Sequence, residues 1–193
     1  METGLTGPWR EMVSRVRRLP GEVMDAVRAE TAATGQRLLA EMKRTILEQR
    51  GMKRPSPVTL AIRAARDAQE APDLGGKRLV DEETLLQALT VVTGPDGSAA
   101  VGIPREAMAR RGRLPLWLIA ARAETGYTIT VTAAMRAWLH SVGVHLRAAT
   151  THLIVPPTRW RRPALEQVAS TSRQRYQDAL ARALRKGAIG TVR

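Results

Sequence analysis

A run of short, differently patterned segments in the second half of the chain leaves that half few ways to fold. Residues 127–132 alternate Tyr, Ile and Val with Thr, which is the pattern of a half-buried strand. Thr132 is a favourable N-cap for a helix over 133–142, and Gly143 can end that helix. A second apolar strand is expected at 150–155. Strand, capped helix and strand in this order predict an α+β fold.

Two long amphipathic helices are predicted toward the ends of the chain. Apolar residues recur at helical spacing over 22–49, although Gly35 weakens the middle of that helix by about 1 kcal/mol relative to Ala. A second apolar stripe predicts a helix over 163–186. A separate short helix is expected over 8–18, because Leu19-Pro20-Gly21 is a helix-breaking sequence.

The middle of the chain contains a β-hairpin signal. Gly94-Pro95-Asp96-Gly97 is flanked by two short apolar segments at 88–93 and 98–103, which predicts two strands joined by a tight turn. Residues 104–111 are expected to form a short helix, and 116–123 a further one.

Together these elements predict an α+β fold. A small antiparallel sheet or half-barrel of about four strands would be packed by a long N-terminal helix and a C-terminal helix. We expect an N-terminal arm over 1–20, a single α+β domain over 21–187 and a flexible tail over 188–193. Within the domain, the Pro- and Gly-flanked residues 51–77 are expected to be an extended connector around a short helix.

Large side chains for a core are scarce, since the chain has no Phe, two Tyr and four Trp. Ala, Leu and Val must fill the core, and Ala buries little area at ~25 cal/mol per Å². We therefore expect a modestly stable monomer that oligomerisation stabilises further. The absence of Cys excludes disulfides and Cys-ligated zinc. No segment resembles a signal peptide or reaches the ~18 apolar residues of a membrane-spanning helix, so a soluble protein without membrane association is expected.

The net charge of +13 is concentrated in the second half of the chain. Residues 1–100 contain 15 Lys and Arg against 14 Asp and Glu, a net of +1, whereas residues 101–193 contain 16 against 4, a net of +12. Arg supplies 15 of those 16 cations, and its guanidinium forms bidentate contacts with carboxylates and phosphates. An acidic protein partner, nucleic acid, or simply the codon bias of a GC-rich genome can each account for this composition.

No motif for catalysis or cofactor binding is present. The spacings of His140, His145 and His152 match neither one face of a helix nor an H-E-x-x-H motif, so no metal site is predicted. Gly75-Gly76-Lys77 lacks the remainder of a phosphate-binding loop, and Asp81-Glu82-Glu83 is interpreted as a solvated acidic turn or helix start. We expect a protein that is not an enzyme and uses no cofactor.

The best candidate for a functional surface is a cluster of Arg residues around one Trp, because Trp and Arg are enriched among residues that dominate binding energies. Flanking prolines stiffen this segment, and further Arg residues follow on the predicted last helix. An alternative is that Trp160 is only a core residue at a strand-to-helix corner. The interface candidates are Arg159, Trp160, Arg161, Arg162, Arg173, Arg175, Arg182 and Arg185.

The ordered segments of the second half resemble the virion-morphogenesis family of tailed phages, also described as neck or tail-completion proteins. In that family an E-x-G turn leads through I-x-V-T and a short helix to a strand that ends in a Pro-, Arg- and aromatic-rich patch. The matching elements here are Glu124-Thr125-Gly126, Ile129-Thr130-Val131-Thr132, Met135 to Leu139, Leu153-Ile154-Val155-Pro156 and Arg159-Trp160-Arg161-Arg162-Pro163.

A second part of the resemblance lies before the predicted hairpin. Residues 78–89 align without a gap with the family's P-L-I-D-T-G-x-L-x-x-S-I segment, except that Glu83 replaces the family's Gly. The strand ending at Ile103 is similar to the family's V-G strand, and Trp160 stands where the family usually has Phe.

The resemblance implies a structural virion protein at the head–tail junction or the top of the tail. It implies a homo-oligomeric ring, most simply of six copies, around the DNA channel, with other neck, connector or tail-tube proteins as partners. Contact with packaged DNA would be transient. The implied location is the virion, and the host cytoplasm during assembly.

Two alternatives remain open from the sequence. A basic nucleic-acid-binding protein would account for the Arg-rich half, although the strand pattern between the predicted helices argues against a helix-turn-helix. A capsid-assembly or scaffolding factor is the other alternative.

Overall fold

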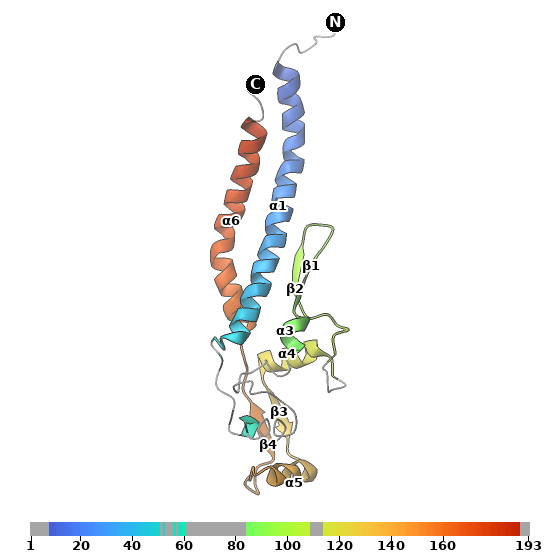
Figure 1. Cartoon of the computed structure of the whole chain (residues 1–193), viewed down its shortest axis with the longest axis vertical. Helices are drawn as coiled ribbons and strands as arrows, with labels where there is room; N and C mark the ends of the chain where they lie inside the picture. Colours follow the sequence, from blue (N-terminus) through green and yellow to red (C-terminus); the bar gives the residue numbers. More distant parts are fainter. Residues whose placement is uncertain are drawn as a thin grey trace. The chain divides into compact units, whose positions relative to one another are not determined.

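The computed structural model describes residues 8–50, 52, 56, 58–60, 84–108 and 114–189. In chain order its elements are α1 (Pro8–Leu47), α3 (Thr84–Ala88), β1 (Thr90–Thr93), β2 (Ala99–Gly102), α4 (Leu116–Thr125), β3 (Tyr127–Thr130), α5 (Ala133–Ser141), β4 (His152–Val155) and α6 (Arg161–Ile189) (Figure 1). The α+β class with long first and last helices is confirmed. The four strands form two separate two-stranded sheets, β1–β2 and β3–β4.

The chain divides into two compact units. Unit 1 comprises residues 1–38, 91–101 and 167–193, and unit 2 comprises residues 39–90 and 102–166. Both α1 and α6 contribute residues to each unit. Nothing in the sequence predicts this division, because no linker composition marks the points at which the two helices pass from one unit to the other.

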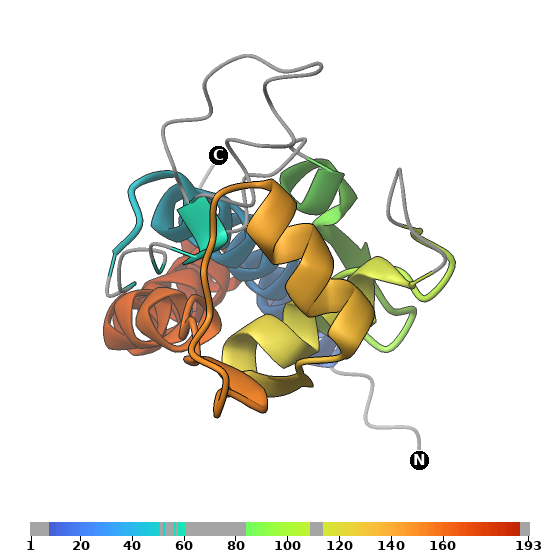
Figure 2. The same ribbon diagram turned by 90° about the horizontal axis from the view of Figure 1, so that it is seen from below.

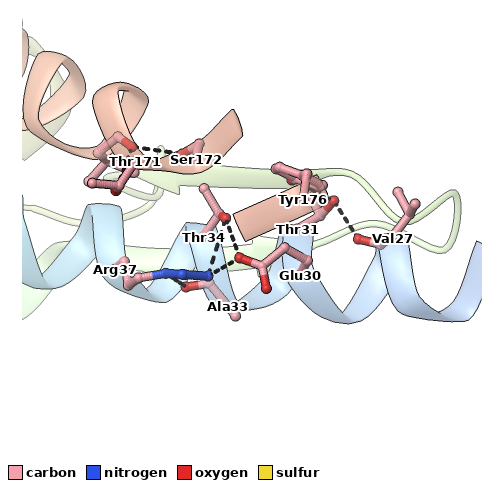
Figure 3. Close-up of polar contacts among 10 residues, drawn as sticks. Val27, Glu30, Thr31, Ala33, Thr34, Arg37, Thr171, Ser172 and Tyr176 are labelled. Carbon is pink, nitrogen blue, oxygen red and sulfur yellow. Dashed lines mark hydrogen bonds and ion pairs between the residues drawn. The ribbon is translucent and has the colours of Figure 1, made fainter. Parts of the chain in front are cut away.

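Unit 1 is a pair of antiparallel helices with a β-hairpin. The unit 1 parts of α1 and α6 lie side by side (Figures 1 and 2). A hydrogen bond of 2.9 Å joins the hydroxyls of Thr31 and Tyr176 across the pair, and the Thr31 hydroxyl also donates to the Val27 carbonyl (Figure 3). On α1, Glu30 forms an ion pair with Arg37. The Thr31–Tyr176 hydrogen bond therefore places these two residues opposite each other across the helix pair.

The hairpin packs on α1 through a glycine. Gly35 is buried, and a Cβ atom there would lie 3.1 Å from side-chain atoms of Val91 and Ala99. Gly35 thus lets the hairpin approach the helix closely. The sequence had indicated only that this glycine weakens the helix. At the tip, Gly97 has a φ of +85°, and Gly94 both accepts from the Gly97 amide and donates to Ser98. The predicted tight turn is confirmed.

Unit 2 contains nearly all of the buried apolar side chains of the described residues. They are Met42, Ile46, Leu85, Leu86, Leu89, Leu116, Ala120, Leu139, Trp160 and Ala164, whereas unit 1 contributes only Ala179. Since the area removed from water sets the hydrophobic stabilisation, unit 1 is the less well packed unit.

Within unit 2, β3 and β4 pair antiparallel, with Tyr127 opposite Val155 and Thr130 opposite His152. The helix α5 connects them. Its N-terminus is capped by the Thr132 hydroxyl, which accepts from the Met135 amide at 3.2 Å. Its C-terminus ends in a Schellman motif at Gly143, with φ of +79°. Both ends were predicted from these two residue types.

The predicted helix break at Leu19-Pro20-Gly21 is wrong, because α1 continues through it. Pro20 removes one backbone hydrogen bond, yet it is exposed, so water can solvate the carbonyl that loses its partner. The boundary expected between an arm over 1–20 and the following domain therefore does not coincide with a helix end.

The helix predicted over 104–111 is also absent from its described part. The Ala107 amide donates to the Pro104 carbonyl in a single turn, and Met108 forms an isolated β-bridge with Pro115. Pairing with the segment before α4 is thus favoured over helix formation. Most of the predicted connector over 51–77 and the first half of the 78–89 motif lie outside the described residues.

The helix predicted over 116–123 and the strands predicted at 127–132 and 150–155 are confirmed as α4, β3 and β4. The last helix is confirmed as well and is longer than predicted, from Arg161 to Ile189. No helix in the described part of the chain combines the length and apolar character needed to span a bilayer.

Candidate interaction surface

The corner between β4 and α6 is a rigid turn built on prolines. After β4 ends at Val155, Pro156 and Pro157 limit the backbone dihedrals. Thr158 is buried, and its amide donates a 2.7 Å hydrogen bond to the Ala123 carbonyl near the end of α4. The corner is thereby fixed to the α4–β3 turn.

Glu124 strengthens this connection. Its carboxylate accepts hydrogen bonds from the backbone amides of Trp160 and Arg161, both at 3.3 Å, and lies 3.6 Å from the Arg161 guanidinium. Because these amides stand at the start of α6, an anion there also interacts favourably with the helix dipole. A side chain 37 positions earlier in the chain thus caps α6.

Gly126 allows the two turns to approach this closely. It has φ of +77° and ψ of 164°, and a Cβ atom there would lie 2.9 Å from both the Val155 carbonyl oxygen and the Pro157 nitrogen. The E-x-G turn and the Pro- and Arg-rich patch, which are separate motif elements in the sequence, therefore form one corner in space.

Trp160 is 3% exposed, so it is a core residue of this corner, as the structural alternative predicts. Its indole nitrogen is buried and has no hydrogen-bond partner among the described residues. Of the four clustered candidates, only the arginines remain on the surface.

The three arginines of the corner differ in how they are held. Arg159 is exposed and has no ion pair with any described carboxylate. Arg161 pairs with Glu124, and its guanidinium carbon lies 6.0 Å from the centre of the Trp160 ring. Arg162 pairs with Glu166 at 2.7 Å, and this hydrogen bond raises the pKa of the Arg162 guanidinium. Of these three arginines, Arg159 is accordingly the one most available to a partner.

The remaining candidates lie on the part of α6 that belongs to unit 1. Arg173, Arg175, Arg182 and Arg185 are all exposed, and within the described ranges none of them has an acidic partner within 4 Å. Because the corner belongs to unit 2, the candidates form two separate groups, one in each unit.

Two of the three histidines meet, although their spacing did not suggest it. The Nδ1 atoms of His140 and His145 are 3.3 Å apart, with the rings edge to face at 4.7 Å. His152 instead pairs with Thr151 at 2.9 Å. No group of three or more metal-ligating side chains occurs among the described residues.

Sequence reasoning missed one feature of unit 2, a clamp formed by Arg136 on α5. Its guanidinium donates to the carbonyls of Leu146, Arg147, Ala148 and Thr150, at 2.7 to 3.4 Å. These bonds hold the loop between α5 and β4. Backbone carbonyls carry no side-chain signature, so no sequence signal could have identified the contact.

Searches with the whole chain found no matching protein-family model, no matching curated protein and no matching solved structure.

Proposed function

We propose that this protein is a structural component of a tailed phage or phage-like particle. It would form a homo-oligomeric ring, of six copies in the simplest case, at the head–tail junction or the top of the tail, around the DNA channel. It acts through docking and not through catalysis, in the virion and, during assembly, in the host cytoplasm.

The observation that carries the proposal is the corner formed by Glu124 and the start of α6. The segments on which the resemblance to neck and tail-completion proteins depends are joined there by hydrogen bonds. A corner already held rigid loses little conformational entropy when it binds a partner. Arg159 extends from this corner without an acidic neighbour among the described residues, which favours an acidic surface on another neck or tail protein as its partner.

The test combines mass and salt dependence. Light scattering after size-exclusion chromatography should show a discrete oligomer, and its partner complexes should weaken steeply as salt rises, because exposed charges are screened over a Debye length of about 8 Å at physiological ionic strength. Arg159→Glu should weaken binding to the neighbouring neck or tail protein, whereas Arg105→Glu, another exposed charge reversal in unit 2, should not. A strictly monomeric protein that binds no other virion component would refute the proposal.

Nucleic-acid binding is the second candidate, and the exposed arginines of α6 favour it. A DNA mobility-shift assay at physiological salt discriminates the two functions. Weak binding beside a discrete oligomer supports the virion role. Tight, salt-sensitive binding by a monomer or dimer supports the nucleic-acid role.

A further inference from the structure

The first turns of α1 extend beyond the end of α6. Thr31 and Tyr176 lie opposite each other, and both helices rise about 1.5 Å per residue. Moving 15 positions toward the N-terminus of α1 reaches Val16, and 15 positions beyond Tyr176 would be position 191, whereas α6 ends at Ile189. The part of α1 up to and including Val16 therefore has no α6 residue opposite it.

This projecting part has an apolar stripe in solvent. Met12 is 54% exposed, Val13 38% and Val16 56%. Their spacing places them on the face that continues at Val23 and Val27, which are half-buried further along the helix. The stripe thus continues the side of α1 that faces α6. In the projecting part of α1 this side has no partner among the described residues.

A groove between α1 and α6 has complementary properties. Its volume is about 480 Å³. Its apolar surface comes from small side chains, which allow another helix to approach closely. Its residues are Glu22, Asp25, Ala26, Ala29 and Glu30 from α1, and Ala179, Arg182, Ala183 and Lys186 from α6.

The charges of the groove are separated. Glu22 and Asp25 lie on the α1 side, and Arg182 and Lys186 on the α6 side. No ion pair within 4 Å joins the two sides in the described part of the molecule. Within α1, Asp25 pairs with the Arg28 guanidinium at 3.6 Å and Glu30 pairs with Arg37. Glu22 is therefore the groove carboxylate that has no ion pair among the described residues and can pair with a cation of another chain.

We propose that the groove binds the projecting stripe of a second copy of this chain. The stripe is followed by Arg17 and Arg18, both exposed, and these cations match the acidic side of the groove formed by Glu22 and Asp25. The apolar side chains of the stripe match its alanine-lined surface. The thin core of unit 1 gives such a contact a large effect on stability.

The contact is heterologous, because the stripe and the groove are different surfaces of the same subunit. Repetition of a heterologous contact produces a closed ring or an open filament. The inference rests on the proposed function, for which it identifies the contact between neighbouring copies.

Cysteine cross-linking tests the contact without background, since the chain has no Cys. Val16→Cys and Ala183→Cys proteins are prepared separately, mixed and mildly oxidised. We expect a disulfide-linked heterodimer of the two variants. The matched control replaces Ala183→Cys with Ser170→Cys, an exposed position of α6 outside the groove, and should give no heterodimer.

Charge reversal supplies an independent measurement. Arg17→Glu combined with Arg18→Glu should weaken self-association by about tenfold or more, as expected when a complementary charge becomes a like charge at an interface. Adding Glu22→Arg and Asp25→Arg should restore it, because both sides of the contact are then reversed.

The outcomes separate this contact from the proposed function. If Val16→Cys links mainly to itself, the stripes pair with one another and the groove proposal is wrong. If light scattering shows the oligomer but no cross-link to Ala183→Cys forms, the contact is wrong while the ring survives. If the protein is monomeric at every concentration and no cross-link forms, both proposals fail.

Discussion

Replacement of Gly126 by Ala tests the corner that joins the α4–β3 turn to the start of α6. Two effects act together at this position. Its φ of +77° with ψ of 164° belongs to a backbone region that is essentially restricted to glycine. In addition, an added Cβ atom would lie 2.9 Å from two backbone atoms, the Val155 oxygen and the Pro157 nitrogen. Neither can move away as a flexible side chain would, because Pro157 is rigid and Val155 is paired in the sheet.

The size of the effect follows from these two terms. Backbone strain of this kind costs about 1–3 kcal/mol, and overpacking adds about 1–3 kcal/mol. We expect Gly126→Ala to lower the free energy of unfolding by about 3–4 kcal/mol. At about 2–4 °C per kcal/mol for a chain of this size, Tm should fall by about 10 °C.

Urea unfolding followed by circular dichroism measures the change, and two other glycines serve as controls. Gly143 also has a positive φ, +79°, but a Cβ atom there would meet nothing within 4 Å, so Gly143→Ala should cost only about 1–2 kcal/mol. Gly21 lies inside α1 in open space, so Gly21→Ala should stabilise by about 0.8–1.0 kcal/mol. If Gly126→Ala costs no more than Gly143→Ala, the close approach at the corner is incorrect.

Three further predictions concern polar contacts. Arg136→Lys should lower the free energy of unfolding by about 2 kcal/mol, because an ammonium cannot reach the carbonyls of residues 146–150 together; urea unfolding measures this. Glu124→Gln should lower the free energy of unfolding by about 1–2 kcal/mol, because it removes the anion at the start of α6. Urea unfolding measures this change as well. Hydrogen bonds from the Ser98 amide and hydroxyl lower the pKa of Asp96 from its ordinary 3.8, so their stabilisation is complete above that pH and is lost as pH falls through the lower folded value. The Asp96→Asn protein should not show this loss of stability at acidic pH, as measured by unfolding curves at a series of pH values.

Matched substitutions separate these effects from general damage. Arg147→Lys, at an exposed loop position, and Glu166→Gln, in an exposed ion pair, should each change stability by less than about 0.5 kcal/mol. Equal losses in Arg136→Lys and Arg147→Lys would show that the clamp contributes nothing. A cost of Glu124→Gln no larger than that of Glu166→Gln would rule out its capping role. The Asp96 interpretation fails if both proteins lose stability equally below pH 3.8.

Local signals predicted those elements whose ends depend on one residue type. Thr132 supplies an N-cap hydroxyl and Gly143 a positive φ, and together they define α5. The Gly94 to Gly97 turn likewise defines the hairpin. The prediction of a helix break at Pro20 was wrong for a related reason. A proline inside a helix has a local energetic cost, and a long helix can tolerate that cost where the proline is exposed.

Contacts between distant segments were beyond local signals. The sequence gives Glu124 only as part of the E-x-G element and the Arg-rich segment as an interface candidate. Only the fold brings the Glu124 carboxylate to amides 36 and 37 positions later. Gly35 was interpreted as a helix defect because the hairpin that packs on it lies more than 50 positions away in the chain. Burial of Trp160 also depends on the elements packed around it. The local sequence was therefore compatible with both a core residue and an interface residue.

The discontinuous make-up of the two units has a consequence for inheritance. Unit 1 draws on three separated stretches of the chain and unit 2 on two, with α1 and α6 shared between them. An uninterrupted gene fragment that encodes either unit whole also encodes part of the other, so recombination cannot transfer one unit alone to another protein. The two units are therefore inherited together.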